Sequence, residues 1–264
     1  MIETIDQLGN KLKFKIMPHR IISVVPSQTE LLYDLGLENN LIGITKFCIH
    51  PEELYKSKFK VGGTKQLNLE KIKALQPDLI IANKEENDRE QIEELQKHFP
   101  VWISDIFTLE DALNMINELG KLFKKETIAH KMINEINYSF SNLIKFTHSK
   151  KICYLIWNNP IMAAGKKTFI NDMLIRCGFE NAIQSEDSRY PVLSINNLQT
   201  YNPEVVFLSS EPYPFKKHHL EYFKKHLPNA NLILVDGEMF SWYGSRLLKA
   251  CNYFKIIQEN LAKS

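Results

Sequence analysis

Arg20-Ile21-Ile22-Ser23-Val24-Val25-Pro26 has the pattern of a buried strand that opens into a loop. Lys151-Ile152-Cys153-Tyr154-Leu155-Ile156-Trp157 has the same pattern 131 residues later. Two further pairs of segments recur in the same order, namely 77–81 with 203–207 and 101–105 with 232–236. A repeat this long indicates two similar domains rather than a solenoid, whose repeats are much shorter.

Strand and helix patterns alternate within each repeat, which is typical of an α/β fold with parallel sheets flanked by helices. Asn68 is expected to cap one of these helices. Ser27 and Glu30 match a capping box at the start of an earlier helix, and Gly36 is expected to end it. The sequence therefore predicts two Rossmann-like lobes.

A long helix is expected between the lobes, because residues 126–146 contain neither Pro nor Gly and place apolar residues every three or four positions. Such a helix of about 20 residues spans roughly 30 Å. Gly120 is expected to interrupt the helix that precedes it. We expect a first α/β lobe at residues 1–107, a helical connector at 108–147 and a second α/β lobe at 148–264, with a ligand cleft between the lobes.

Composition limits the classes of partner. The 264 residues carry 33 basic and 31 acidic side chains, a net charge of +2, which predicts neither nucleic-acid binding nor an anionic membrane surface as partner. No apolar run is long enough to span a membrane, and residues 1–7 lack the features of a signal peptide. We expect a cytoplasmic protein as written, or a periplasmic or lipid-anchored one if a signal peptide has been removed.

Catalytic signatures are scarce in this sequence. It contains no GxSxG, HExxH or GxGxxG motif, and its four cysteines form no CxxC pair. The chain is therefore expected not to be an enzyme and to require no cofactor.

Polar and aromatic residues cluster instead where predicted strands end, the edge at which open α/β sheets bind ligands. In the first lobe, Cys48 and His50 in one loop could hold a metal, or could be a loop cysteine and a surface histidine. Glu85 and Glu86 could face a ligand or complement a helix dipole.

In the second lobe, the proline-rich segment 210–215 predicts a rigid wall that holds Tyr213 and Phe215. The segment 236–246 places three aromatic residues and Arg246 beyond a strand, where they could stack on a flat or anionic ligand or pack against the core.

Several segments resemble the class III substrate-binding proteins of ABC importers, which carry cobalamin, haem and iron-siderophores, and the likeness covers nearly the whole chain. The most specific pieces are 20–31, 43–45, 68–80, 163–166 and 177–182. This resemblance implies two lobes joined by one long helix, usually in a monomer. It also implies docking to a permease through an acidic residue on each lobe; Glu70 fits the first position, and the uncharged Asn196 lies near the second.

The resemblance implies a cleft lined by aromatic residues. Phe47 and Phe240 keep aromatic character there, whereas Thr64 and Asn83 stand where tryptophans are expected. We expect a small-ligand-binding protein for a corrinoid or metal chelate. The expected ligand-binding residues are Lys46, Phe47, His50, Asn83, Glu85, Glu86, Trp157, Tyr190, Glu211, Tyr213, Phe215, Trp242, Tyr243 and Arg246. The alternatives are a relative that has acquired catalysis, and one that binds a bare metal ion through Cys48, His50 and a carboxylate.

Overall fold

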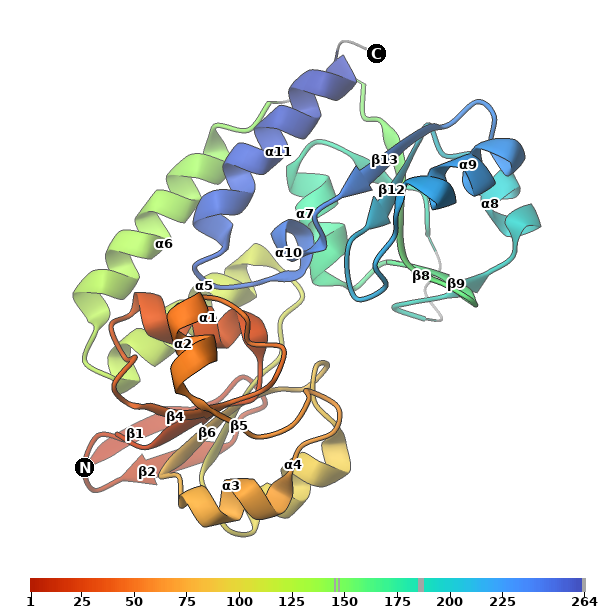
Figure 1. The fold of residues 1–264 in the computed structure, drawn as a ribbon. Helices are drawn as coiled ribbons and strands as arrows, with labels where there is room; N and C mark the ends of the chain where they lie inside the picture. Colours follow the sequence, from red (N-terminus) through yellow and green to blue (C-terminus); the bar gives the residue numbers. More distant parts are fainter. Residues whose placement is uncertain (145, 147, 185–187, 263–264) are drawn as a thin grey trace. The chain divides into compact units, whose positions relative to one another are not determined.

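The computed structural model describes residues 1–144, 146, 148–184 and 188–262 (Figure 1). The chain divides into two compact units. Unit 1 holds Met1–Ile106, Glu110–Ile136 and Trp242–Leu247. Unit 2 holds Phe107–Leu109, Asn137–Ser241 and the chain from Leu248 on. The described helices include none that is both long enough and apolar enough to cross a membrane.

Unit 1 is built on a five-stranded parallel sheet with the order β5-β4-β3-β6-β7. Its strands are β3 (Ile21–Ser23), β4 (Leu41–Ile44), β5 (Phe59–Lys60), β6 (Leu79–Asn83) and β7 (Val101–Ser104). The central strands β3 and β6 are buried throughout, as expected for a sheet that helices cover on both faces. A separate antiparallel hairpin is formed by β1 (Ile2–Ile5) and β2 (Lys11–Phe14).

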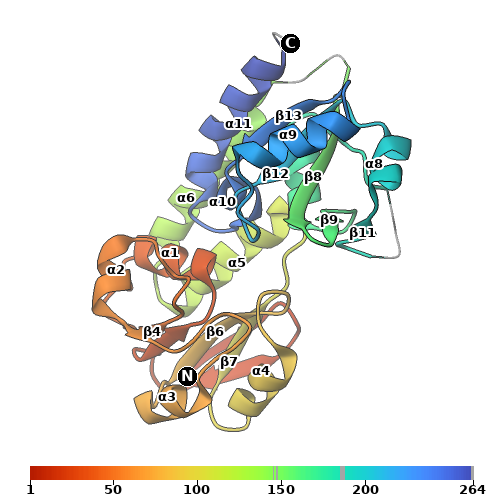
Figure 2. The same cartoon turned by 45° about the vertical axis from the view of Figure 1, so that its right-hand side comes forward.

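The helices of unit 1 cover the two faces of this sheet. They are α1 (Pro26–Asp34), α2 (Glu52–Ser57), α3 (Leu69–Leu75), α4 (Arg89–Gln96) and α5 (Leu109–Leu122). Figures 1 and 2 show α1 and α5 on one face and α3 and α4 on the other. On the second face, Ile72 of α3 and Ile92 of α4 pack with Ile22 and Ile80 in one core.

The expected capping box at the start of α1 is wrong. The N-cap is Val25, two residues before Ser27, with Pro26 at the first position of the helix, and no side chain caps it. The Glu30 carboxylate is instead held by Arg246, which lies 216 residues away in the chain. Gly36 does follow the end of the helix, with a φ of 76° that favours glycine.

Gly120 does not interrupt α5, which continues to Leu122. A Cβ atom at position 120 would lie 2.5 Å from the Cβ of Ala129, so glycine permits close packing between α5 and α6 (Glu126–Ser141). The helix α6 ends before the expected residue 146, and its residues are shared between unit 1 and unit 2.

Unit 2 is built on a six-stranded sheet with the order β11-β9-β8-β12-β13, in which β10 also pairs with β8. Its strands are β8 (Lys151–Asn158), β9 (Ile161–Ala163), β10 (Glu180–Asn181), β11 (Val192–Leu193), β12 (Val205–Ser209) and β13 (Asn231–Val235). The strands β8, β10, β12 and β13 are parallel, whereas β9 is antiparallel to both of its neighbours. The sheet is therefore mixed at one edge.

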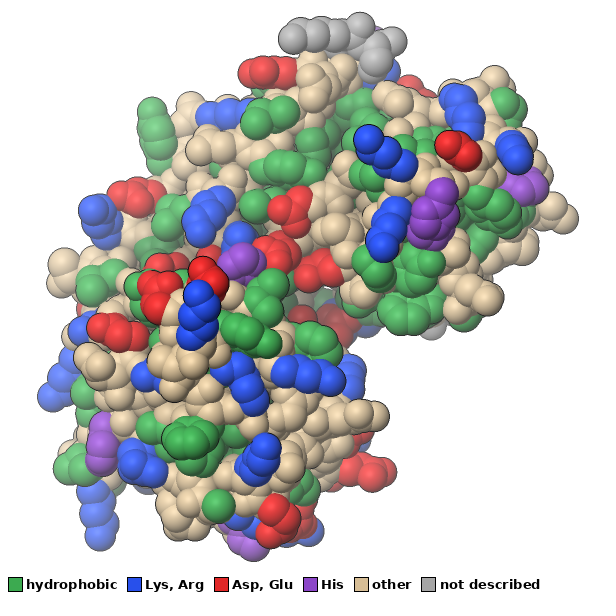
Figure 3. Space-filling model, in the orientation of Figure 1, with side chains coloured by type: hydrophobic (Ala, Val, Ile, Leu, Met, Phe, Trp, Pro, Cys, Tyr) green, Lys and Arg blue, Asp and Glu red, His purple; other side chains and the backbone are tan. Residues whose placement is uncertain are grey.

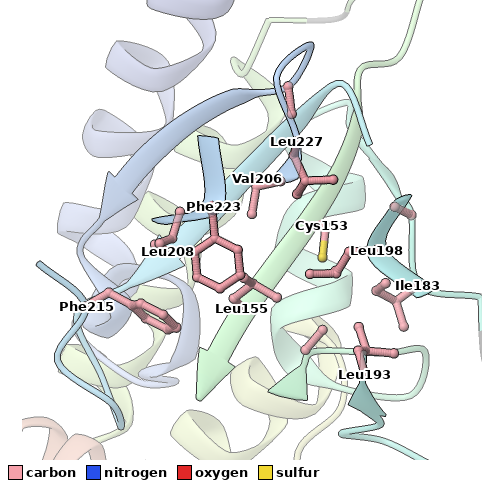
Figure 4. Packing of buried hydrophobic residues seen from close by; sticks show 13 residues of the cluster. Cys153, Leu155, Ile183, Leu193, Leu198, Val206, Leu208, Phe215, Phe223 and Leu227 are labelled. Carbon is pink, nitrogen blue, oxygen red and sulfur yellow. The ribbon is translucent and has the colours of Figure 1, made fainter. Parts of the chain in front are cut away.

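The helices of unit 2 are α7 (Phe169–Arg176), α8 (Ile195–Tyr201), α9 (Lys217–His226), α10 (Gly237–Ser241) and α11 (Leu247–Ala262). Figure 4 shows Phe223 of α9 lying over Leu155 of β8, with Leu208 of β12 beside them. This core is separate from that of unit 1.

The repeat seen in the sequence corresponds to one arrangement present in both units. The neighbouring parallel strands β3, β6 and β7 match β8, β12 and β13 in order. The helices before β6 and β12 also have matching ends. Asn68 and Ser194 cap their starts through side chains, and Gln76 and Asn202 end them with φ of 45° and 46°. Each pair is 126 residues apart.

Candidate functional site

The carboxyl ends of β3, β4 and β6 lie at one edge of the unit 1 sheet. The chain turns to opposite sides after β3 and β6, so this edge is a switch point of the kind where open α/β sheets bind ligands. After β4, the Phe47 ring is 50% exposed and the Lys46 Nζ lies 5.1 Å from its centre. The backbone N–H of Lys46 donates to the Gly62 carbonyl at 2.8 Å and so holds this loop beside the next one.

Cys48 and His50 have different surroundings. Cys48 is fully buried, and the hydroxyls of Thr29 and Thr45 both lie 3.1 Å from its sulfur. Burial raises the pKa of the Cys48 thiol. The His50 ring packs edge-on against Trp242, 5.6 Å between centres. Among the described residues, no group of three or more His, Cys, Asp or Glu side chains could hold a metal ion.

The loop after β6 is organised by two buried asparagines. The Asn83 amide donates to Ser104, and its carbonyl oxygen accepts the backbone N–H groups of Glu85 and Glu86 at 2.8 and 2.9 Å. Asn83 therefore faces inward, contrary to its expected position on the ligand surface. Glu85 and Glu86 are half-buried and precede α4, whose N-cap is Asp88, so they do not occupy its first turn.

Asn87 was not singled out by the sequence analysis. Its amide donates to the carbonyls of Val24 at 3.1 Å and Thr64 at 3.0 Å, and its side-chain oxygen accepts from the Asn83 N–H. This single side chain joins the loops that follow β3, β5 and β6. In the sequence, the one indication of this role is that Asn87 lies in a predicted loop.

Trp242, Tyr243 and Arg246 are buried within unit 1, each 6% exposed. The Arg246 guanidinium lies 4.8 Å from the Trp242 ring centre, and its Nε donates to Glu30 Oε2 at 2.8 Å. Of the two interpretations of this segment, the structure shows packing against a core rather than exposed stacking surfaces.

The matching edge of unit 2 carries the loop after β12. Tyr213 is half-buried, and its ring lies 5.6 Å from that of Trp157, which is 38% exposed. Phe215 instead points into the core and is 5% exposed, contrary to its expected place on the wall. Phe240 likewise is fully buried.

The remaining candidates have the following surroundings. Glu211 Oε1 accepts from the Ser241 hydroxyl at 2.8 Å. Tyr190 is half-buried next to the exposed Ser188. Glu70, in the first turn of α3, has a side chain 88% exposed, and the exposed Asn196 holds the matching place on α8. Acidic and basic side chains are interspersed over the face shown in Figure 3.

Comparison with known proteins reveals clear relatives. The family model described as "Periplasmic binding protein" matches residues 21–232. The vitamin B12-binding protein of Vibrio campbellii is 32% identical over 194 residues, covering 72% of this chain and 70% of that protein.

Two solved structures share the fold. The periplasmic vitamin B12-binding protein BtuF of Vibrio cholerae aligns with a TM-score of 0.75 at 20% identity, covering 94% of this chain and 99% of that one. The periplasmic heme-binding protein RhuT from Roseiflexus sp. RS-1 aligns with a TM-score of 0.78 at 18% identity, covering 92% and 99%. The match of the family model to most of the chain, together with these relatives, shows that the protein belongs to the periplasmic binding protein family.

Proposed function

We propose that this protein binds a small molecule without transforming it and delivers it to an ABC importer. The observation that carries this proposal is the family match over residues 21–232, with relatives named for binding vitamin B12. Exposed aromatic side chains at the carboxyl ends of strands in both sheets support it, because such side chains provide contact area for a ligand.

The ligand class that we propose is a corrinoid, a haem or another metal chelate. Phe47, Trp157 and Tyr213 offer flat surfaces for a large ring system. The Lys46 ammonium next to Phe47 would pair with a carboxylate of such a ligand. The metal would arrive with its chelate, so that the protein needs no cofactor of its own.

Catalysis is not part of this proposal. Burial raises the pKa of the Cys48 thiol and so disfavours the thiolate, which is the reactive form. The comparisons favour neither a catalytic relative nor one that binds a bare metal ion.

We propose an ABC permease as the protein partner and Glu70 as one docking residue, since its carboxylate is exposed at the start of α3. Asn196 offers no charge at the matching place on α8, so docking would rely on other side chains there. We propose a periplasmic location rather than a cytoplasmic one, which the match to the periplasmic binding protein family supports. We also propose that the protein acts as a monomer.

Isothermal titration with cyanocobalamin, haemin and a ferric catecholate siderophore tests the ligand class. We expect one of them to bind, and Phe47→Ala and Trp157→Ala each to weaken that binding about fivefold to tenfold. Phe59→Ala is the matched control, because Phe59 is 68% exposed and lies outside the candidate site. The proposal fails if none of the three ligands binds, or if Phe47→Ala and Trp157→Ala bind as tightly as Phe59→Ala.

A further inference from the structure

In unit 2, the ring of His219 packs against that of Tyr213, with 5.4 Å between the ring centres. It is 8% exposed, at the third position of α9, and its two ring nitrogens contact different groups. Nδ1 lies 2.9 Å from the backbone nitrogen of Lys216, and Nε2 lies 3.0 Å from the hydroxyl oxygen of Tyr213. A buried imidazole thus connects the start of a helix to a residue of the candidate site.

The backbone of Lys216 determines which ring nitrogen carries the hydrogen. An amide N–H can only donate, so Nδ1 at 2.9 Å must be the bare nitrogen that accepts from it. A hydrogen on Nδ1 would point at the Lys216 N–H and would leave only the Lys216 carbonyl, at 3.3 Å, as a partner. Burial lowers the pKa of His219, which favours the neutral ring. The neutral ring then carries its hydrogen on Nε2.

This tautomer determines whether the Tyr213 hydroxyl donates or accepts in its hydrogen bond with His219. The Nε2–H donates to the Tyr213 oxygen, and the amide nitrogen of Asn158, 3.4 Å away, is a second donor to it. Within the described part of the chain, these are the hydrogen-bond partners of that oxygen, and neither offers an acceptor. Tyr213 is half-buried, and its hydroxyl hydrogen therefore has no acceptor on His219 or Asn158.

We infer that Tyr213 donates its hydroxyl hydrogen to an oxygen acceptor of the bound ligand, and that His219 is the positioning residue that imposes this direction. The acceptor is a carboxylate, an amide carbonyl or a phosphate oxygen. While the phenol keeps its hydrogen, both lone pairs of its oxygen face the His219 and Asn158 donors, so the neutral Tyr213 side chain donates to the ligand and does not coordinate a metal in it. This inference rests on the proposed binding function.

The tautomer can be measured without any ligand. Two-dimensional ¹⁵N–¹H spectra that correlate imidazole nitrogens with ring carbon-bound protons distinguish the two neutral forms. We expect His219 Nδ1 to resonate as an unprotonated nitrogen and Nε2 as a protonated one, with assignment by loss of the signals in His219→Asn. The reverse assignment would overturn the inference whether or not a ligand is known.

Binding variants then test the donor role, with cyanocobalamin and haemin as probes because both carry oxygen acceptors. We expect Tyr213→Phe to lower affinity about fivefold, which corresponds to one net hydrogen bond. His219→Asn keeps an oxygen that can accept the Lys216 N–H but lacks the donor to Tyr213, and should lower affinity about threefold. In the Tyr213→Phe background, His219→Asn should have no further effect.

Tyr222→Phe is the matched control, because Tyr222 is on the same helix and its ring packs against His226 instead. The absorption bands of the haemin complex should keep their positions in Tyr213→Phe, since the iron is not bound by that oxygen. The inference alone is overturned if the wild type binds but Tyr213→Phe binds equally well or shifts these bands. If the wild type binds neither probe, both this inference and the proposed function for these ligands fail.

Discussion

At the scale of single residues, the most consequential contact is the ion pair between Glu30 and Arg246. Their side chains are 6% and 7% exposed, so water screens neither charge. The sequence predicts other roles for both residues. Glu30 is expected to cap the start of a helix, and Arg246 is expected to bind a ligand. A contact between residues 216 positions apart leaves no local pattern, which is why the pair could not be predicted.

Replacing Arg246 with Met should lower the free energy of unfolding by about 3–5 kcal/mol, because the Glu30 carboxylate would stay buried without its partner. Urea denaturation followed by tryptophan fluorescence measures this change. Lys56→Met removes an ion pair whose side chains are 69% and 75% exposed and should cost at most about 1 kcal/mol. Equal effects of the two substitutions would contradict the importance of burial. Adding Glu30→Gln to Arg246→Met should recover part of the loss.

The four cysteines allow a test of thiol reactivity. All are buried, and burial raises the pKa of Cys48 and Cys177 above its ordinary value and that of Cys153 and Cys251 to about 12. We expect no reaction of the native protein with an aromatic disulfide reagent at pH 8, and full reaction once urea unfolds it. Absorbance of the released thiolate measures the extent. Rapid labelling of one cysteine in the native protein would show that its thiol is accessible.

At the scale of elements, the buried parallel strands and the cap of α3 were predictable because their signals are local, whereas the cap expected for α1 was wrong. Asn68 caps α3 as expected, through a hydrogen bond from the Lys71 N–H. Gly120 was misinterpreted because a glycine in a helix can mark either a break or a close contact, and only the position of Ala129 distinguishes the two. The solvent exposure of loop residues such as Asn83 and Phe215 likewise depends on partners in other elements.

Gly120→Ala should destabilise the protein by about 1–3 kcal/mol, although alanine alone favours a helix over glycine by about 1 kcal/mol. The added methyl group would lie 2.5 Å from the Ala129 Cβ and would push α5 away from α6. Thermal and urea denaturation measure the loss. Ala129→Gly in the same protein should restore much of it by removing the opposing methyl group. A Gly120→Ala protein as stable as the wild type would disprove the close contact.

The helix α4 should contribute a pH-dependent stability through Glu94. Hydrogen bonds from Lys97, His98 and Lys73 lower the pKa of Glu94 from 4.5 to about 2. A carboxyl whose pKa is lower in the folded state stabilises the fold above pH 4.5 and loses that effect as the pH falls toward 2. Wild type should therefore exceed Glu94→Gln in stability at pH 6, and the difference should shrink between pH 4.5 and 2. A difference that stays constant over this range, in urea denaturation, would contradict the lowered pKa.

At the scale of the whole molecule, the repeat in the sequence predicted two units with related strand orders, and the structure has both. The segment Trp242–Leu247 belongs to unit 1 although the chain before and after it belongs to unit 2. Its buried contacts with His50 and Glu30 account for this assignment. The boundaries expected at residues 107 and 147, and the cleft between the lobes, remain predictions.

The two separate cores lead to a prediction about cooperativity. Ile80 of β6 and Leu155 of β8 are both fully buried, one in each core, and replacing either with Ala should cost about 2–5 kcal/mol. Because each core is confined to its own unit, Ile80→Ala should speed amide hydrogen exchange in β6 much more than in β12, and Leu155→Ala should do the reverse. Hydrogen exchange followed by mass spectrometry of peptides from the two strands measures this. Equal acceleration of both strands by either substitution would show instead that the units unfold together, with the shared helix α6 and the segment Trp242–Leu247 as the elements that couple them.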